Sequence, residues 1–257
     1  MGLRNSKSQC ERGKTGLDAM ASEAQAEPSL SSPPSFALTL DAVSRRFGKR
    51  WAVVRASFEV APGSCLMLTG PNGSGKTSLL RCLATELKPH FGSIRINGED
   101  LWQNRLKLRH HIAFVAHDTR LYDDMSALEN LNLLGSLSPN PTEPARWIAQ
   151  VGLAEAQNRP VREYSAGMRR RLALATALMK QPRLLLLDEP FAALDGDGRA
   201  IAAKALEELR SQGATVVIAT HRPHVAAPSC DSALHLVAGR ITWSGDAEQA
   251  LALGVAT

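Results

Sequence analysis

The chain is 257 residues long, 44% hydrophobic but only 5% aromatic, with 30 lysines and arginines against 25 acidic residues. This length and composition are typical of an α/β protein with a substantial core. The net charge of +5 is mild and its basic runs lack interleaved aromatic residues, which argues against a nucleic-acid partner, and no stretch approaches the roughly 18–20 apolar residues of a membrane span.

The first 35 residues are dominated by Ser, Pro, Gln, Glu and Ala and show no apolar periodicity. Such a segment cannot bury enough apolar surface to fold, so we expect residues 1–35 to be a disordered tail. Met20 is an alternative start of translation, and its use would remove residues 1–19.

The folded part is expected to begin with strands. Phe36–Ser44 and Ala52–Val60 alternate or run apolar, which predicts two antiparallel strands. Gly92–Asn97 is expected to join the same sheet. The short apolar run Cys65–Thr69, which leads directly into a glycine-rich loop, predicts a buried strand.

Residues 70–77 fit the phosphate-binding loop pattern G-x-x-x-x-G-K-[ST] at every fixed position, and the predicted helix Ser78–Glu86 follows. The glycines let backbone N–H groups turn toward an anion at a helix N-terminus. Lys76 adds a positive charge for the β- and γ-phosphates, and the Thr77 hydroxyl can hold Mg²⁺. We therefore expect a nucleoside triphosphate to be bound by Gly70, Pro71, Asn72, Gly73, Ser74, Gly75, Lys76, Thr77 and Ser78.

A helical region is expected in the middle of the chain, after the predicted strand Ile112–Ala116. Ala127–Leu137 and Glu143–Val151 have helical spacing, and Tyr164–Met168 opens a longer helical segment, Arg169–Lys180. A serine at the start of that helix both caps it and leaves N–H groups facing an anion. Because the loop 70–77 already has phosphates, this second anion site needs a different nucleotide.

Arg183–Pro190 reads Arg-Leu-Leu-Leu-Leu-Asp-Glu-Pro. Four leucines that end in two acids predict a central parallel strand, buried on both faces, with carboxylates at its C-terminal edge. Asp188 is expected to bind Mg²⁺, directly or through water. Glu189 lies where it could polarise a water molecule for attack on the γ-phosphate.

The C-terminal third continues the α/β alternation. Asp197–Ser211 has the pattern of an amphipathic helix, and Thr215–Thr220 is an apolar strand. Ala233–Val237 and Ile241–Trp243 flank Ala238-Gly239, which predicts a hairpin.

Neither a disulfide framework nor a zinc site is predicted. The four cysteines, at positions 10, 65, 82 and 230, have no paired spacing, which favours reduced, buried thiols. The histidines do not form a set with the carboxylate or thiol partners that zinc usually has.

These motifs, in this order and spacing, resemble the ATP-binding cassette (ABC) ATPases over residues 36–252. The helix start Tyr-Ser-Ala-Gly-Met stands where the family usually has Leu-Ser-Gly-Gly-Gln. Ser165 and Gly167, the positions that contact phosphate in the family, are retained. Ala166 and Met168 depart from the pattern.

The resemblance implies a P-loop fold with a mixed, largely parallel central sheet, an antiparallel β subdomain and a helical subdomain at about 118–181, leaving 253–257 as a C-terminal end. It also implies that Phe47 stacks on adenine, that His221 contacts the γ-phosphate, and that Ala193–Asp195 relays between two sites. Glu189, His221 and Lys76 would carry catalysis on ATP and Mg²⁺. Two subunits would sandwich the nucleotides, with Ser165 and Gly167 reaching the partner's γ-phosphate.

His117 is the main departure, because the family has a Mg²⁺-contacting glutamine at that place. Imidazole is a poor direct ligand for Mg²⁺, which prefers hard oxygen atoms. Three alternatives remain: a contact through water, a γ-phosphate contact by the protonated ring, or replacement by Asp118. We favour the water-mediated contact, against the simpler interpretation that His117 has no role in the site.

Within the family, the single cassette, His117 and the stretch Leu121–Leu131 look most like the ATPase subunit of the haem exporter of cytochrome c maturation. That resemblance implies a separate permease and a peripheral position on the cytoplasmic face of the inner membrane. ATPases of drug or polysaccharide export are the alternative. Two rivals are a cassette ATPase without a membrane partner, which usually has two cassettes or coiled-coil insertions, and an idle regulatory cassette.

Overall fold

The computed structural model describes residues 36–136 and 143–254. Contacts divide the chain into Met1–Ser32 and Pro33–Thr257, and all described residues belong to the second unit. The expected tail 1–35 and the predicted helix end at Leu137 lie outside the described residues. None of the helices in the described ranges has the length and apolar character needed to cross a bilayer.

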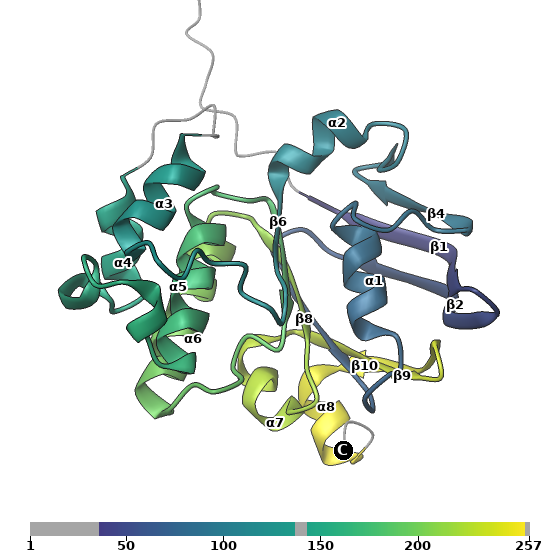
Figure 1. The fold of residues 1–257 in the computed structure, drawn as a ribbon. Helices are drawn as coiled ribbons and strands as arrows, with labels where there is room; N and C mark the ends of the chain where they lie inside the picture. Colours follow the sequence, from purple (N-terminus) through teal and green to yellow (C-terminus); the bar gives the residue numbers. More distant parts are fainter. Residues whose placement is uncertain (1–35, 137–142, 255–257) are drawn as a thin grey trace, which may run out of the picture. The chain divides into compact units, whose positions relative to one another are not determined.

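An antiparallel sheet forms one layer of this unit (Figure 1). Its order is β2-β1-β4-β5, with β1 at Leu38–Phe47, β2 at Arg50–Val60, β4 at Phe91–Ile96 and β5 at Glu99–Asp100. The predicted antiparallel pairing is confirmed, but β1 and β2 run further than predicted into the turn that joins them, so that Phe47 pairs with Arg50. Phe47 therefore stands at the tip of this hairpin.

A second, six-stranded sheet has the order β10-β9-β3-β8-β7-β6. The strands are β3 (Cys65–Thr69), β6 (Ile112–Val115), β7 (Leu184–Asp188), β8 (Thr215–Ala219), β9 (Ser232–Val237) and β10 (Arg240–Asp246). Only the β9–β10 hairpin is antiparallel, and β7 lies between β6 and β8 in parallel pairing. The prediction of a central parallel strand at Arg183–Pro190 is confirmed.

The helices are α1 (Lys76–Leu83), α2 (Arg105–Leu108), α3 (Ala127–Gly135), α4 (Pro144–Gln150), α5 (Ala166–Leu178), α6 (Gly196–Ser211), α7 (Pro223–Ala226) and α8 (Ala247–Ala252). Helix α1 ends before the predicted Glu86, because Thr85 takes a left-handed φ of 60° and Glu86 N–H donates back to the Arg81 carbonyl at 2.9 Å. Helix α5 begins at Ala166, three residues earlier than predicted, because Ser165 caps it.

Strand β7 separates two hydrophobic cores. Leu184 and Leu186 pack with α1 and the antiparallel sheet, whereas Leu185 and Leu187 pack with the helices on the other side, α3 to α6 (Figure 1). All four side chains are fully buried, which stabilises the fold by about 2 kcal/mol each. Because successive side chains of β7 point to opposite faces of the sheet, this strand packs against the layers on both sides.

A close backbone contact joins the two sheets beside the glycine-rich loop. Ala52 in β2 presents its carbonyl oxygen to Gly75 and Gly239, where a Cβ atom would lie only 2.1 and 2.8 Å from that oxygen. Gly239, in the β9–β10 turn, also donates its N–H to the Ser74 carbonyl and accepts from Val54 N–H, both at 2.8 Å. We call this contact of Ala52, Gly75 and Gly239 the glycine junction.

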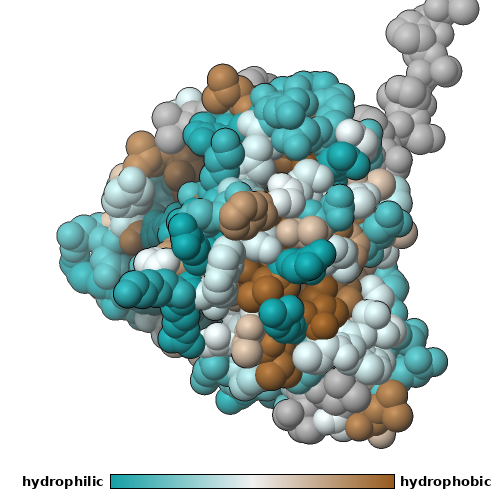
Figure 2. Space-filling view, turned by 90° about the vertical axis from the view of Figure 1, so that its right-hand side faces the viewer, coloured by the Kyte–Doolittle hydropathy of each residue, from teal (hydrophilic) through white to brown (hydrophobic). Residues whose placement is uncertain are grey.

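The cysteines in the described residues are free thiols; Cys65 and Cys82 are buried as predicted, whereas Cys230 is only partly buried. Cys82 is buried, which raises its pKa to about 12. Cys65 and Cys230, far apart in sequence, bring their Sγ atoms to 3.2 Å, a proximity that their spacing did not predict. The face on the side of the β1–β2 turn carries mainly polar residues around a smaller apolar area near its centre (Figure 2).

Replacement of Gly239 by alanine tests the glycine junction, and Gly98 provides a matched control. Both glycines lie in hairpin turns with φ near +80°, but a Cβ on Gly98 would meet nothing within 4 Å. We expect Gly98→Ala to lower the free energy of unfolding by about 1–2 kcal/mol, the cost of a left-handed alanine. Gly239→Ala should cost a further ~1–3 kcal/mol because the Ala52 carbonyl must move. Urea denaturation followed by circular dichroism measures both, and equal losses would show that the contact is not tight.

Candidate functional site

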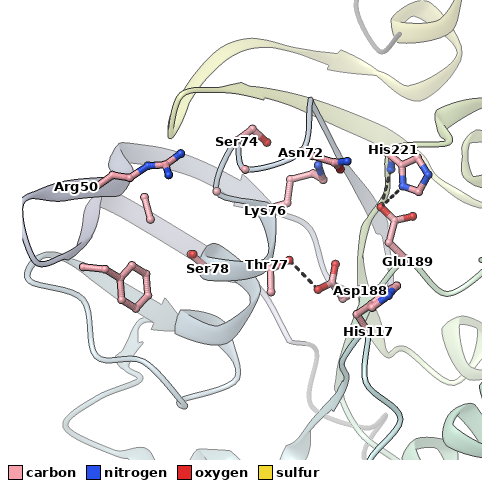
Figure 3. A pocket seen from close by; sticks show the side chains of 14 residues that line it. Arg50, Asn72, Ser74, Lys76, Thr77, Ser78, His117, Asp188, Glu189 and His221 are labelled. Carbon is pink, nitrogen blue, oxygen red and sulfur yellow. Dashed lines mark hydrogen bonds and ion pairs between the residues drawn. The ribbon is translucent and has the colours of Figure 1, made fainter.

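A cavity of about 640 Å³ lies where the β1–β2 hairpin, the loop 70–77 and the C-terminal ends of β6, β7 and β8 meet (Figure 3). Most of the residues predicted to bind or act on a nucleotide line it. Its lining consists of Phe47, Arg50, Ala52, Asn72, Gly73, Ser74, Gly75, Lys76, Thr77, Ser78, His117, Asp188, Glu189 and His221.

The glycine-rich loop opens helix α1 toward this cavity. Gly75 occupies the N-cap position with a φ of 111° and makes no side-chain cap hydrogen bond. The N–H groups of the first helical turn therefore remain available to an anion, and the helix dipole favours negative charge there. Gly70 and Pro71, also predicted to bind phosphate, do not line the cavity.

The side chain of Lys76 is buried beside the cavity. Its Nζ donates to the Gly70 carbonyl at 2.7 Å and the Pro71 carbonyl at 3.2 Å. Burial lowers the pKa of Lys76, whereas the carboxylates of Glu189 and Asp188 act in the opposite direction. Gly70 and Pro71 thus contribute to the site by holding this ammonium group.

Thr77 and Asp188 form the candidate metal position. The Thr77 hydroxyl donates to an Asp188 carboxylate oxygen at 2.8 Å (Figure 3). Asp188 is only 4% exposed, and its pKa is raised, mainly by burial, although the bond from Thr77 acts against this rise. A hydroxyl beside a carboxylate is an oxygen donor set that suits Mg²⁺. Among the described residues, no group of three or more His, Cys, Asp and Glu side chains is arranged to hold a metal ion on its own.

Glu189 follows directly in an unusual backbone conformation, with a left-handed φ of 55°. Its carboxylate accepts from the backbone N–H of His221 at 2.8 Å and from the Thr220 hydroxyl at 3.0 Å. The Nδ1 atom of His221 lies 2.8 Å from the same carboxylate. The two predicted catalytic side chains therefore contact each other at the ends of β7 and β8.

His117 lies at the end of β6 and lines the cavity beside Asp188 (Figure 3). It is among the groups that counteract the raised pKa of Asp188. Asp118, considered as a replacement for the family's glutamine, does not line the cavity, and its carboxylate accepts from the Arg120 N–H at 3.3 Å. The geometry therefore disfavours Asp118 and leaves His117 next to the candidate metal position.

Ser165 and Gly167 do not reach this cavity within the chain. Ser165 caps α5, its side chain accepting from Met168 N–H at 3.2 Å, which confirms the predicted capping role. Gly167 packs against the segment before α6, because a Cβ there would lie 2.9 Å from the Ala193 carbonyl oxygen. Neither residue lines the cavity.

The hairpin that carries Phe47 supplies two residues that sequence reasoning missed. Phe47 is 47% exposed, and the guanidinium of Arg45 lies 5.0 Å from its ring centre. Arg50 and Ala52 line the cavity from β2. The pairing of β1 with β2 brings these two residues to the cavity. In the sequence, the one signal for them is their position three and five residues after Phe47.

Comparisons with known proteins agree with this arrangement. A family model described as "ABC transporter" matches residues 53–192. The chain is 34% identical to the daunorubicin resistance ATP-binding protein DrrA3 of Streptomyces coeruleorubidus over 218 residues, which cover 83% of this chain and 69% of that protein. It is 38% identical to the cytochrome c biogenesis ATP-binding export protein CcmA of Pseudomonas putida over 196 residues, 75% of this chain and 93% of that one.

A solved structure agrees in fold. CbiO1 of Clostridium perfringens, part of the ABC transporter complex cbiONQ, superimposes with a TM-score of 0.74 at 25% identity, covering 85% of this chain and 91% of that chain. The predicted fold class is therefore confirmed. From the family model, the relatives and the fold together, the chain belongs to the ABC transporter family as an ATPase domain.

Proposed function

We propose that this chain binds and hydrolyses ATP as the motor subunit of an exporter whose permease is a separate polypeptide. Members of this family hydrolyse ATP and act as dimers with membrane permeases. The observation that supports the proposal most directly is the convergence of Lys76, the Thr77–Asp188 pair and the Glu189–His221 pair on one cavity.

Each group at the cavity has a distinct part in the proposed reaction. Phe47 stacks on adenine, and the N–H groups of α1 with Lys76 hold the phosphates. Thr77 and Asp188 would hold Mg²⁺, with His117 contacting it through water, and the ion would supply positive charge to the phosphates. These residues position the triphosphate for in-line attack by water.

Glu189 and His221 act at the γ-phosphate. The Glu189 carboxylate accepts a proton from the attacking water, and its left-handed backbone directs it from the end of β7 toward β8. His221, held by that carboxylate through both its backbone N–H and its ring, contacts the γ-phosphate. Catalysis is then positioning together with charge neutralisation, with no covalent enzyme intermediate.

A second subunit completes the proposed site. The first turn of α5, which begins after Ser165 and contains Gly167, does not line the chain's own cavity. Its N–H groups can therefore bind an anion that is held by another molecule. We propose that two copies, or one copy and a related subunit, sandwich two ATP molecules. Loss of the γ-phosphate would release the grip of both halves.

For the cargo we propose haem, exported for cytochrome c biogenesis, with the subunit peripheral on the cytoplasmic face of the inner membrane. The identity of 38% to a cytochrome c biogenesis export protein over 93% of its length supports this assignment. Drug export is the second candidate, because the daunorubicin resistance protein matches a longer stretch of this chain. Polysaccharide export and a cassette ATPase without a membrane partner are the remaining alternatives.

Disruption of the gene in its native host separates these cargoes. If the proposal holds, covalently bound haem in c-type cytochromes should disappear on haem-stained gels, while drug sensitivity stays unchanged. The wild-type chain, when restored, should return the cytochromes and co-purify with an integral membrane protein. Normal cytochromes together with drug hypersensitivity would assign the subunit to drug export instead.

Glu189→Gln tests the catalytic assignment. Loss of the general base should lower the ATPase rate of the permease complex by about 10²–10⁴ while ATP binding persists, because the amide keeps the side chain's size. The nucleotide should then trap a dimer, visible by light scattering with Mg-ATP. Glu163→Gln is the matched control, since Glu163 lies on the surface 3.5 Å from Arg159, and it should keep normal turnover. Normal turnover in Glu189→Gln would remove Glu189 from the mechanism.

His117→Gln tests the water-mediated contact. Glutamine offers an oxygen at the same place, so we expect ATPase activity to stay within a few-fold of wild type. Asp118→Asn, at the adjacent residue outside the cavity lining, should be neutral. A complete loss of activity in His117→Gln would mean that the imidazole itself is required.

A further inference from the structure

Arg170 is a buried cation next to the site that neither the motifs nor the proposed reaction uses. It lies in the second turn of α5 and is only 5% exposed. Its guanidinium donates to backbone carbonyls at the ends of two neighbouring strands. Nη1 donates to Ala116 at 2.7 Å and His117 at 3.3 Å, Nε donates to Glu189 at 3.0 Å, and Nη2 donates to Asp188 and Glu189.

These bonds are unusual because their acceptors are neutral. A buried guanidinium is normally paired with a carboxylate, since removing a charge from water is costly. Burial lowers the pKa of Arg170, and the nearby charges of Asp188 and Glu189 compensate in part. The planar fork of donors matches four carbonyl groups that no ammonium group could reach together.

Three of the four carbonyls belong to residues that line the cavity, His117, Asp188 and Glu189. Arg170 spans the gap between His117, two residues after β6, and the Asp188-Glu189 pair at the end of β7. Glu189 has a left-handed φ of 55°, a strained conformation that persists only where its surroundings fix it. Its N–H donates to Ala219 at 2.8 Å, and its carbonyl accepts from Arg170, so both sides of this residue are held.

We propose that Arg170 is a positioning residue for ATP hydrolysis. It fixes the backbone of Asp188 and Glu189 relative to His117, and so sets where the metal-binding and water-activating carboxylates point. It does this from α5, the helix whose tip carries Ser165 and Gly167. The bonds of Arg170 thus tie the proposed partner-facing tip to the carboxylates of the chain's own site, an inference that rests on the proposed function.

Arg171 provides a matched control on the same helix. Its Nη1 donates to the Val151 carbonyl at 2.9 Å and the Gly152 carbonyl at 3.1 Å, away from the cavity. Arg171→Met therefore removes guanidinium–carbonyl bonds from the same helical turn without touching the strand ends. Any loss of activity that comes only from loosening α5 should appear in both variants.

The experiment compares Arg170→Met, Arg170→Lys and Arg171→Met as full chains in complex with the permease. We expect Arg170→Met to lower kcat by about 10–100-fold, as removal of outer-shell partners typically does, with the Kd for ATP within about 3-fold of wild type. The Mg²⁺ concentration for half-maximal activity should also rise about 10-fold or more, because Asp188 is displaced. Arg171→Met should change neither kinetic quantity, whatever its effect on thermal stability.

Arg170→Lys keeps the positive charge, so it tests the inference even if the methionine variant does not fold. Because an ammonium group has three donors and no fork, it should restore the rate only in part. Equal kcat values for Arg170→Met and Arg171→Met, corrected for folded protein, or a wild-type rate in Arg170→Lys, would overturn the inference. A wild-type complex that neither binds nor hydrolyses ATP would instead overturn the proposed function.

Discussion

Strand β7 packs its leucines alternately into two hydrophobic cores, and this double burial fixes where Asp188 and Glu189 emerge. Because the strand pairs on both sides, a shift by one residue would send every leucine to the opposite core and break the ladders with β6 and β8. The position of the two carboxylates is thus secured by the interior of the unit. The loop 70–77, the β1–β2 hairpin and the end of β8 are arranged around them.

The charges at this edge of the sheet are balanced across several elements. Lys76 and Arg170 are buried cations, and burial lowers the pKa of each, whereas burial raises the pKa of Asp188. Each of these shifts is partly offset by the neighbouring charges of opposite sign. The arrangement leaves Lys76 held by loop carbonyls, which a triphosphate can replace with its own oxygen atoms.

The sequence predicted the features whose signal is local. The loop pattern, the leucine strand and the Ser165 cap each depend on a few adjacent residues, and all three appear where expected. Boundaries shifted where backbone hydrogen bonds decided them, as at Thr85 beyond α1. Arg50 and the Cys65–Cys230 pair were missed because only tertiary pairing brings them to their neighbours. The ABC resemblance extended the prediction to roles that no local pattern carries.

The run Arg169–Arg171 shows most clearly why the rest could not be predicted. Successive helical residues point about 100° apart, so three identical side chains have three different surroundings. Arg169 pairs with Asp123 at 2.5 Å on the surface, Arg170 is buried at the strand ends, and Arg171 binds carbonyls beyond α4. The three arginines are the same residue type in adjacent positions, so residue type and sequence spacing could not tell them apart.

The glycine junction determines how far the β1–β2 hairpin, which carries Phe47, stands from the loop 70–77. No side chain takes part in the contact of Ala52 with Gly75 and Gly239, so no rotamer can absorb an error in this separation. The hairpin end and the loop end of the cavity are therefore held at a fixed separation. If the cavity binds ATP as proposed, the nucleotide must fit a span that main-chain atoms alone set.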